Sequence, residues 1–192
     1  MSKPKNNSLP IFLIAIDGHG GSGKSTLANL LADRLQAQVI HTDDFAEWDN
    51  PLNWWPLAIE RVFEPIRNGK KLLNYPRSKW WKTHNPEPVF NQPVTPIMIL
   101  EGVSSLRKEF RPYISYGIFV DTPLEVCWQR VFERDRGQDG KSDDKIKQMW
   151  QQWYEDEETY IKQDNPKEYA ELVVEGTKSF DQYVLKDLFE NL

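Results

Sequence analysis

The sequence predicts an α/β fold, a parallel β-sheet with helices on both of its faces. Short apolar runs, each the length of one buried strand, recur along the 192 residues. The segments between them space their apolar residues as on one face of a helix. This alternation of strand and helix is typical of parallel sheets, in which crossover helices join consecutive strands.

Five apolar runs are the expected strands. The first is continuous over residues 11–16, which predicts a strand buried on both faces. The others are shorter and rich in β-branched or aliphatic residues: 39–41, 97–100, 118–120 and 172–174.

Three helices are expected between these strands. Residues 26–35 and residues 146–161 both carry apolar residues at helical spacing. A third stripe covers residues 124–132. Thr122 and Glu125 predict a capping box at its start, with Pro123 at the first helical position.

Composition and charge exclude several classes of protein. Twenty-four Lys and Arg against 29 Asp and Glu leave a net charge of −5, so no basic field favours nucleic acid or an anionic membrane. No apolar stretch approaches the length of a membrane span, and residues 1–10 are expected to be a flexible polar terminus. The single cysteine, Cys127, excludes an intrachain disulfide, and a cytoplasmic location is expected.

Residues 11–192 are expected to form one domain with an insertion at 46–93. The insertion is rich in Trp, Pro and Asn and shows no convincing buried strand, although residues 57–67 predict a helix that Pro65 breaks. Ligands of parallel sheets bind beyond the carboxyl ends of the strands, so the insertion is the expected wall of a substrate pocket.

The phosphate-binding motif G-x-x-x-x-G-K-[ST] is present in full as residues 18–25, directly after the first strand. Its glycines allow a tight curl in which successive backbone N–H groups line phosphate oxygens. The Lys24 ammonium is expected at the β- and γ-phosphates, and the Ser25 hydroxyl on Mg²⁺. The expected nucleotide contacts of the loop are Gly18, His19, Gly20, Gly21, Ser22, Gly23, Lys24, Ser25 and Thr26.

Acidic residues follow four of the expected strands: Asp17, Asp43 with Asp44, Glu101 and Asp121. Because parallel strands end at one edge of the sheet, these carboxylates should gather beside the phosphate loop. Asp43 is the predicted general base or orienter of an acceptor hydroxyl. Asp44 is predicted either to contact the substrate or to cap the following turn, and Glu101 to lie near Mg²⁺ and the acceptor.

Arginines mark a candidate lid at about residues 130–143. Arg130 and Arg134 are four residues apart and share a helix face, and Arg136 opens a polar, glycine-containing stretch. Closing over a triphosphate, they would stabilise the transferred group, with Arg134 in a catalytic role. The alternative is a solvated helix face that pairs with Glu133 and Asp135.

Five of the eight tryptophans lie in the insertion, where rings stack on a planar base or simply form core. The predicted acceptor contacts there are Trp48, Tyr75, Arg77, Trp80 and Trp81. The positive charge of Arg77 is also compatible with an anionic acceptor.

Several blocks of the chain resemble the uridine kinase and phosphoribulokinase group of P-loop kinases. They occur in the family's order, as Ile-Ala-Ile-Asp followed by the phosphate loop, Thr-Asp-Asp-Phe, Ile-Leu-Glu-Gly-Val, Ile-Phe-Val-Asp-Thr-Pro and the arginine segment, at residues 14–26, 42–45, 99–103, 118–123 and 130–137.

The resemblance implies a P-loop NTPase fold with three αβα layers and five parallel strands in the order 2-3-1-4-5. It implies transfer of the ATP γ-phosphate to a hydroxyl with Mg²⁺, the catalytic acid at Asp43 and lid arginines at Arg130, Arg134 and Arg136. The segment that shapes the nucleoside pocket of uridine kinases corresponds to residues 75–81, which carry neither its acid nor its histidine in place.

The expected function is therefore that of an ATP-dependent kinase of a nucleoside-like acceptor, with a small molecule and ATP as partners. The alternatives are a kinase of a sugar phosphate, a vitamin precursor or a nucleoside monophosphate, and a nucleotide-hydrolysing switch. The sequence lacks the Asn-Lys-x-Asp segment that reads guanine, which disfavours the switch.

Overall fold

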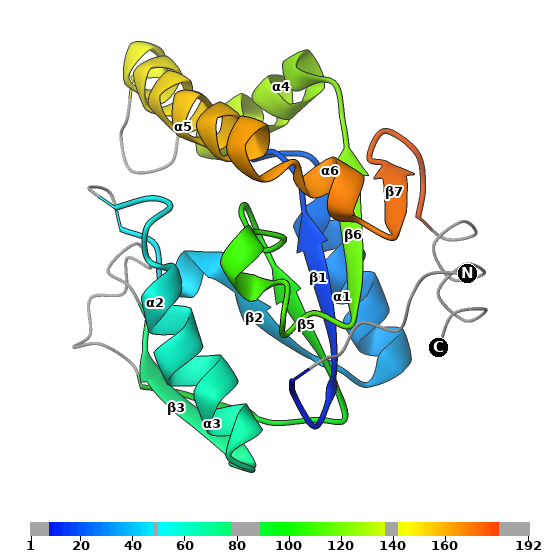
Figure 1. Cartoon of the computed structure of the whole chain (residues 1–192). Helices are drawn as coiled ribbons and strands as arrows, with labels where there is room; N and C mark the ends of the chain where they lie inside the picture. Colours follow the sequence, from blue (N-terminus) through cyan, green and yellow to red (C-terminus); the bar gives the residue numbers. More distant parts are fainter. Residues whose placement is uncertain (1–7, 48–49, 78–88, 137–141, 181–192) are drawn as a thin grey trace.

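The computed structural model describes residues 8–47, 50–77, 89–136 and 142–180 (Figure 1). Five parallel strands form its central sheet in the order β2-β5-β1-β6-β7. Their bounds are Phe12–Asp17 for β1, Gln38–His41 for β2, Ile97–Glu101 for β5, Tyr116–Asp121 for β6 and Leu172–Glu175 for β7. Counted along these five strands, the order is the expected 2-3-1-4-5.

The central strand β1 is buried on both faces, as its continuous apolar run predicts. Leu13 and Ala15 face one core and Ile14 and Ile16 the other, because successive side chains of a strand point to opposite faces. Both cores are therefore centred on the strand that leads into the phosphate loop.

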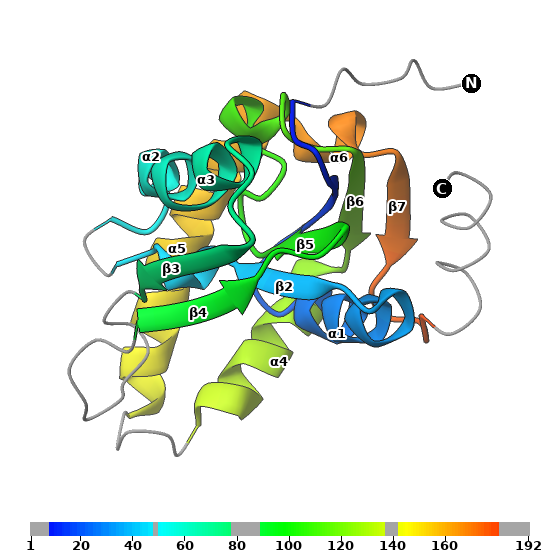
Figure 2. The ribbon, with the colours of Figure 1, turned by 90° about the horizontal axis from the view of Figure 1, so that it is seen from below.

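Helices cover both faces of the sheet and its carboxyl end. Helix α1 (Lys24–Leu35) packs on one face, and a helical segment of the insertion packs on the other, as Figure 2 shows. Helices α4 (Leu124–Asp135) and α5 (Asp143–Asp164) cross the end to which the strands point, followed by the short α6 (Pro166–Tyr169) (Figure 1). Functional side chains at the strand ends therefore lie under α4 and α5.

Pro65 does not break the insertion's helix, so that prediction is wrong. Helix α2 (Trp55–Ala58), a π-helical turn at Ile59–Phe63 and α3 (Glu64–Arg67) follow one another without interruption. A proline clashes with the carbonyl one turn earlier in a regular α-helix, and the wider π-helical turn directly before Pro65 relieves this crowding.

The insertion also contains a hairpin that the sequence did not predict. Strands β3 (Leu72–Pro76) and β4 (Val89–Pro93) pair antiparallel. Leu73 and Tyr75 are buried while Leu72 and Asn74 are exposed. This alternation is too short to identify a strand from the sequence, and the prolines within the two strands argue against one.

One further expectation, about a helix cap, is corrected. The Thr122 hydroxyl donates to the Ser22 carbonyl at 2.8 Å instead of capping α4, whose N-cap is Pro123. A tertiary partner thus overrides the local capping pattern. Of residues 1–10, the structure describes residues 8–10, where Leu9 is buried and the Ser8 N–H donates to the Pro112 carbonyl at 3.2 Å.

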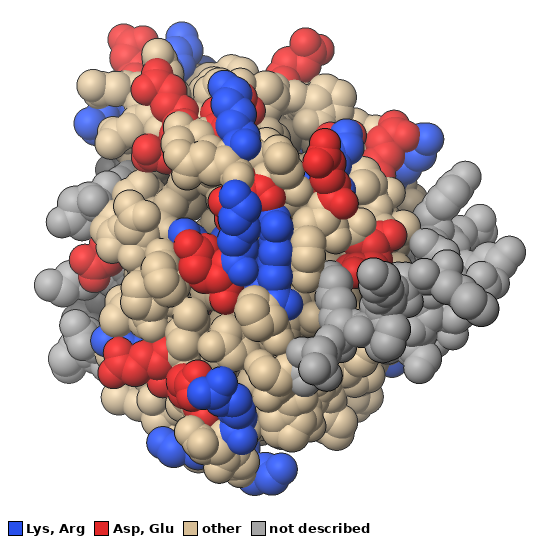
Figure 3. All heavy atoms as spheres, in the orientation of Figure 1, with Lys and Arg blue, Asp and Glu red and all other residues tan. Residues whose placement is uncertain are grey.

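The charged surface agrees with the composition. On the face seen in Figure 3, acidic and basic side chains alternate and no broad basic area appears. No helix among the described residues is long and apolar enough to span a membrane.

The Trp54→Ala substitution is expected to lower the free energy of unfolding by about 3–4 kcal/mol, because it opens a large cavity in the core. Trp54 is only 2% exposed and stacks on Phe45. Urea unfolding measures the loss. The matched control Leu72→Ala, at a side chain that is 48% exposed, should change it by less than about 0.5 kcal/mol. Equal effects would place Trp54 outside the core.

Candidate nucleotide and acceptor site

The loop between β1 and α1 has the curled backbone that its glycines predict. Gly21 and Gly23 adopt φ values of +80° and +105°, which favour glycine. A Cβ at Gly21 would lie 2.4 Å from the Cys127 carbonyl oxygen, so α4 packs directly against the loop. The loop is held from outside as well, by the Thr122 hydroxyl described above.

Lys24 and Ser25 start α1 with their polar atoms in the site. The Lys24 Nζ donates to the His19 carbonyl at 2.8 Å, across the curl of the loop. The Ser25 Oγ donates to Glu101 Oε1 at 3.0 Å, which joins the loop to the end of β5. The carboxylate at the end of β5 therefore lies beside the phosphate loop, as predicted.

The Asp17 carboxylate at the end of β1 is a hub for the surrounding segments. Its Oδ1 accepts from the Gly18 N–H at 2.7 Å and the Ser104 N–H at 3.1 Å. Its Oδ2 accepts from the Leu106 N–H at 2.7 Å and the Tyr160 hydroxyl at 2.6 Å. Burial raises the pKa of Asp17, and hydrogen bonds from Tyr160, Leu106 and Gly18 oppose that rise.

A pocket of about 440 Å³ adjoins the phosphate loop at the carboxyl edge of the sheet. Its walls bring together residues from five segments, among them Lys24, Ser25, Asp43, Glu101, Arg134 and Glu157. Three segments that are distant in sequence thus face the end of the loop, as expected for an acceptor site, and a fourth, α5, was not predicted to contribute.

Asp43 lies in this pocket on a 3-10 turn formed by Thr42–Asp44. Its side chain is exposed to solvent in the pocket, yet protein surrounds it on most sides. This partial loss of water, together with the negative charge of Glu101, raises the pKa of Asp43, while Lys24 opposes the rise.

Glu101 is paired with a histidine that sequence reasoning left unassigned. His41 Nδ1 lies 2.7 Å from Glu101 Oε2, and this hydrogen bond raises the pKa of His41. Burial alone would raise the pKa of Glu101, but the hydrogen bond from His41 and the charge of Lys24 lower it overall. Glu101 is therefore held ionised. His41 ends β2 beside β5, a register position that only the sheet order reveals.

A second pocket, of about 700 Å³, lies on the other side of the loop. Its walls include Lys24, Thr26, Arg130, Arg134, Thr177 and Phe180. Arg130 spans it, because its guanidinium donates to the Gly21 and Ser22 carbonyls at 3.3 Å and to the Gly176 carbonyl at 3.0 Å. The segment after β7 was not predicted; its signal is a glycine directly behind a strand end.

Arg134 lines both pockets, whereas Arg136 lines neither of them. Arg134 is 60% exposed on its side chain and pairs with Asp135 at 2.7 Å. Arg136 is 65% exposed and lies 3.6 Å from Asp143. Two of the three expected lid arginines thus face the site in this conformation.

Other predicted acceptor contacts lie elsewhere. Asp44 is buried, with its Oδ1 3.0 Å from the Arg77 Nε and its Oδ2 accepting from the Tyr75 hydroxyl at 3.2 Å. Tyr75 is 1% exposed, and its pKa is raised by burial and by Asp44. These three residues form an internal cluster that does not line the acceptor pocket. The predicted Trp48, Trp80 and Trp81 lie outside the described residues.

The donor set at the loop fits Mg²⁺ shared with nucleotide phosphates. No group of three or more His, Cys, Asp or Glu side chains is arranged to hold a metal among the residues that the structure describes. Ser25 and Glu101 nevertheless offer a hydroxyl and a carboxylate 3.0 Å apart, the hard oxygen ligands that Mg²⁺ takes together with phosphate oxygens.

The Asp17→Asn substitution is expected to destabilise the fold by about 2–4 kcal/mol. An amide turns an NH₂ group toward buried donors that the carboxylate now satisfies. Urea unfolding measures the loss against Asp33→Asn, an exposed position on α1. Tyr160→Phe removes one of the four donors and should cost about 1 kcal/mol. If Asp17→Asn leaves the free energy of unfolding unchanged, the hydrogen bonds to Asp17 do not stabilise the fold as proposed.

Known proteins share this fold and sequence pattern. A model of the Phosphoribulokinase / Uridine kinase family matches residues 57–181, more than half of the 192 residues. The uridine kinase of Klebsiella pneumoniae is 26% identical over 161 residues, 72% of this chain and 75% of the relative. That of Serratia proteamaculans is 26% identical over 185 residues, 84% of this chain and 85% of the relative.

A solved structure described as a possible uridine kinase from Bacillus stearothermophilus has the same fold, with a TM-score of 0.61 and 21% identity. The match covers 86% of this chain and 89% of that one. The family match does not include the phosphate loop, and residues 18–25 carry the phosphate-binding motif that P-loop kinases share. The chain belongs to the phosphoribulokinase and uridine kinase family.

Proposed function

We propose that the protein is an ATP-dependent kinase that transfers the γ-phosphate to a hydroxyl of a small, nucleoside-like acceptor. The observation that carries this proposal is the shared pocket of Lys24, Ser25 and Asp43. A phosphate-binding lysine and a carboxylate then face the same space, as transfer to an alcohol requires. The name uridine kinase, which the relatives carry, supports a nucleoside-like acceptor.

The two pockets divide the substrates between them. The loop amides and Lys24 would bind the phosphates, and the pocket spanned by Arg130 would receive the rest of the nucleotide. The acceptor would lie in the pocket of Asp43. Because Lys24, Ser25 and Arg134 belong to both pockets, the γ-phosphate would lie at their common wall.

Asp43 and Arg134 would carry the chemistry. Asp43 orients the acceptor hydroxyl and takes its proton, and its raised pKa makes it a better base than an ordinary aspartate. Arg134, at the wall of both pockets, stabilises the charge on the transferred group. Mg²⁺, held by Ser25 and Glu101, would neutralise phosphate charge when bound.

We propose that residues 46–93 act as the acceptor-side insertion and residues 130–143 as a lid of the same domain. Closure would bring Arg130 and Arg134 over the phosphates and exclude water. Arg77, the candidate receiver of a phosphorylated acceptor, is engaged by Asp44 away from the pocket, which favours an acceptor without phosphate.

A screen of coupled ADP release over nucleosides, nucleotides and small alcohols tests the proposal. We expect ADP release that depends on an added nucleoside or related alcohol and requires Mg²⁺. ADP release that no added alcohol or nucleotide stimulates would instead indicate a nucleotide-hydrolysing switch.

The Asp43→Asn substitution is expected to lower kcat at least about 100-fold while Mg²⁺-ATP still binds, because only the base is lost. Lys24→Ala should weaken ATP binding as well, because it removes a phosphate contact. Calorimetry measures binding and the coupled assay measures turnover. Full turnover by a folded Asp43→Asn protein would remove Asp43 from its assigned role.

The rate should also depend on pH through Asp43. A base must be ionised, so kcat/KM should fall as the pH drops through the pKa of Asp43. Because that pKa is raised, the acid limb should lie above the value of about 4 of an ordinary aspartate. The residual activity of Asp43→Asn is the control and should lack this limb. A wild-type limb at or below pH 4 would contradict the assignment.

A further inference from the structure

Glu157, in the middle of α5, contacts the phosphate loop. The Gly20 N–H lies 3.3 Å from its Oε1 and 3.2 Å from its Oε2. His19 Nδ1 lies 2.9 Å from the same Oε2. The side chain is only 14% exposed and forms part of the acceptor pocket's wall. None of the roles described above uses this carboxylate.

The contact places the Glu157 carboxylate on a backbone N–H of the loop, a group that typically binds anions. Backbone N–H groups of such a loop bind phosphate oxygens, and the Gly20 N–H points at a carboxylate here. A carboxylate and a phosphate oxygen cannot both take this donor, and two negative charges at such a distance repel one another. The Lys24 Nζ donates to the His19 carbonyl at 2.8 Å in this arrangement.

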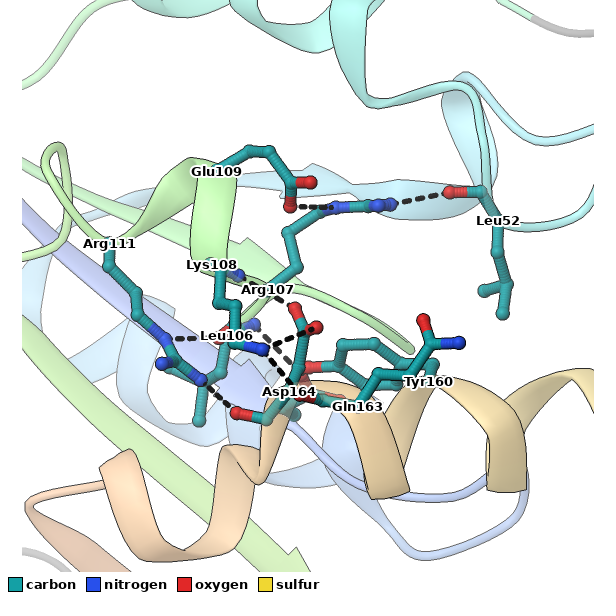
Figure 4. A network of polar contacts seen from close by, with 10 residues as sticks. Leu52, Leu106, Arg107, Lys108, Glu109, Arg111, Tyr160, Gln163 and Asp164 are labelled. Atoms are coloured by element: carbon teal, nitrogen blue, oxygen red, sulfur yellow. Dashed lines mark hydrogen bonds and ion pairs between the residues drawn. The ribbon is translucent and has the colours of Figure 1, made fainter.

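The helix that carries Glu157 is anchored on the body of the protein. One turn later, the Tyr160 hydroxyl donates to Asp17 at 2.6 Å. At the end of α5, Asp164 accepts from the Lys108 N–H at 2.7 Å, within the network that Figure 4 shows. Gln163 and Arg111 add further contacts there. Glu157 is thus presented to the loop from a fixed helix.

We infer that Glu157 competes with the nucleotide's phosphates for the loop. In the nucleotide-free protein its carboxylate occupies the Gly20 N–H, and phosphate binding displaces it. This inference rests on the proposed function, since it needs a polyphosphate ligand. Displacement opposes binding, so Glu157 lowers nucleotide affinity and speeds release. It also couples the two sites, because the displaced side chain belongs to the acceptor pocket.

Calorimetry in the presence of Mg²⁺ tests this with ATP and with tripolyphosphate, which lacks base and sugar. Glu157→Gln should bind both about tenfold more tightly than wild type, because the amide carries no charge and is a weaker acceptor. The matched control Glu155→Gln removes the same charge from an exposed position two residues away. It should change either affinity less than twofold.

The outcomes separate this inference from the proposed function. If wild type binds ATP and Glu157→Gln gains nothing, the competition is refuted and the kinase proposal stands. A gain of equal size in Glu155→Gln would also refute it, because it would reflect net charge alone. If no variant binds ATP or tripolyphosphate, both proposals fail. Glu157→Asp keeps the charge but shortens the side chain, so it should also bind ATP and tripolyphosphate more tightly than wild type. It takes the place of Glu157→Gln in the test if the Glu157→Gln protein does not fold.

Discussion

The Asp17 carboxylate is the interaction on which the arrangement of the site depends. It ends the central strand, and its four donors come from the phosphate loop, the segment after β5 and helix α5. A buried carboxylate is costly unless hydrogen bonds surround it, so these segments are held in one mutual position. The loop and the helix that faces it are thereby fixed together.

Two pockets share one wall beside the phosphate loop. Lys24, Ser25 and Arg134 belong to both, while Arg130 closes one side and Asp43 the other. A group that is transferred between two ligands needs such a common wall, since phosphoryl transfer depends on positioning and charge more than on covalent chemistry. The family assignment agrees with this layout, and Glu157 adds an anion at the same place.

The sequence predicted the parts of the site that follow from strand ends. The phosphate loop, Asp43 and Glu101 each lie at the carboxyl end of a strand, and the carboxyl ends of parallel strands share an edge. It missed His41, Glu157 and the segment after β7. These act through partners at least 46 residues away in the chain, for which no local pattern exists. Tyr75 was predicted to contact the acceptor from its place in an aromatic-rich segment, but its side chain is buried in the core.

The amino-acid sequence by itself determined the five strands, their order through the family resemblance, and the loop that carries the phosphate-binding motif. Local periodicity indicates the strands and glycine content indicates the loop, whereas the order of the strands rests on the resemblance. Tertiary structure decided which charges meet. Asp44 pairs with Arg77 inside the protein, Thr122 holds the loop instead of its own helix, and Glu157 reaches Gly20. Such choices depend on distances between segments, which packing sets and sequence spacing does not encode.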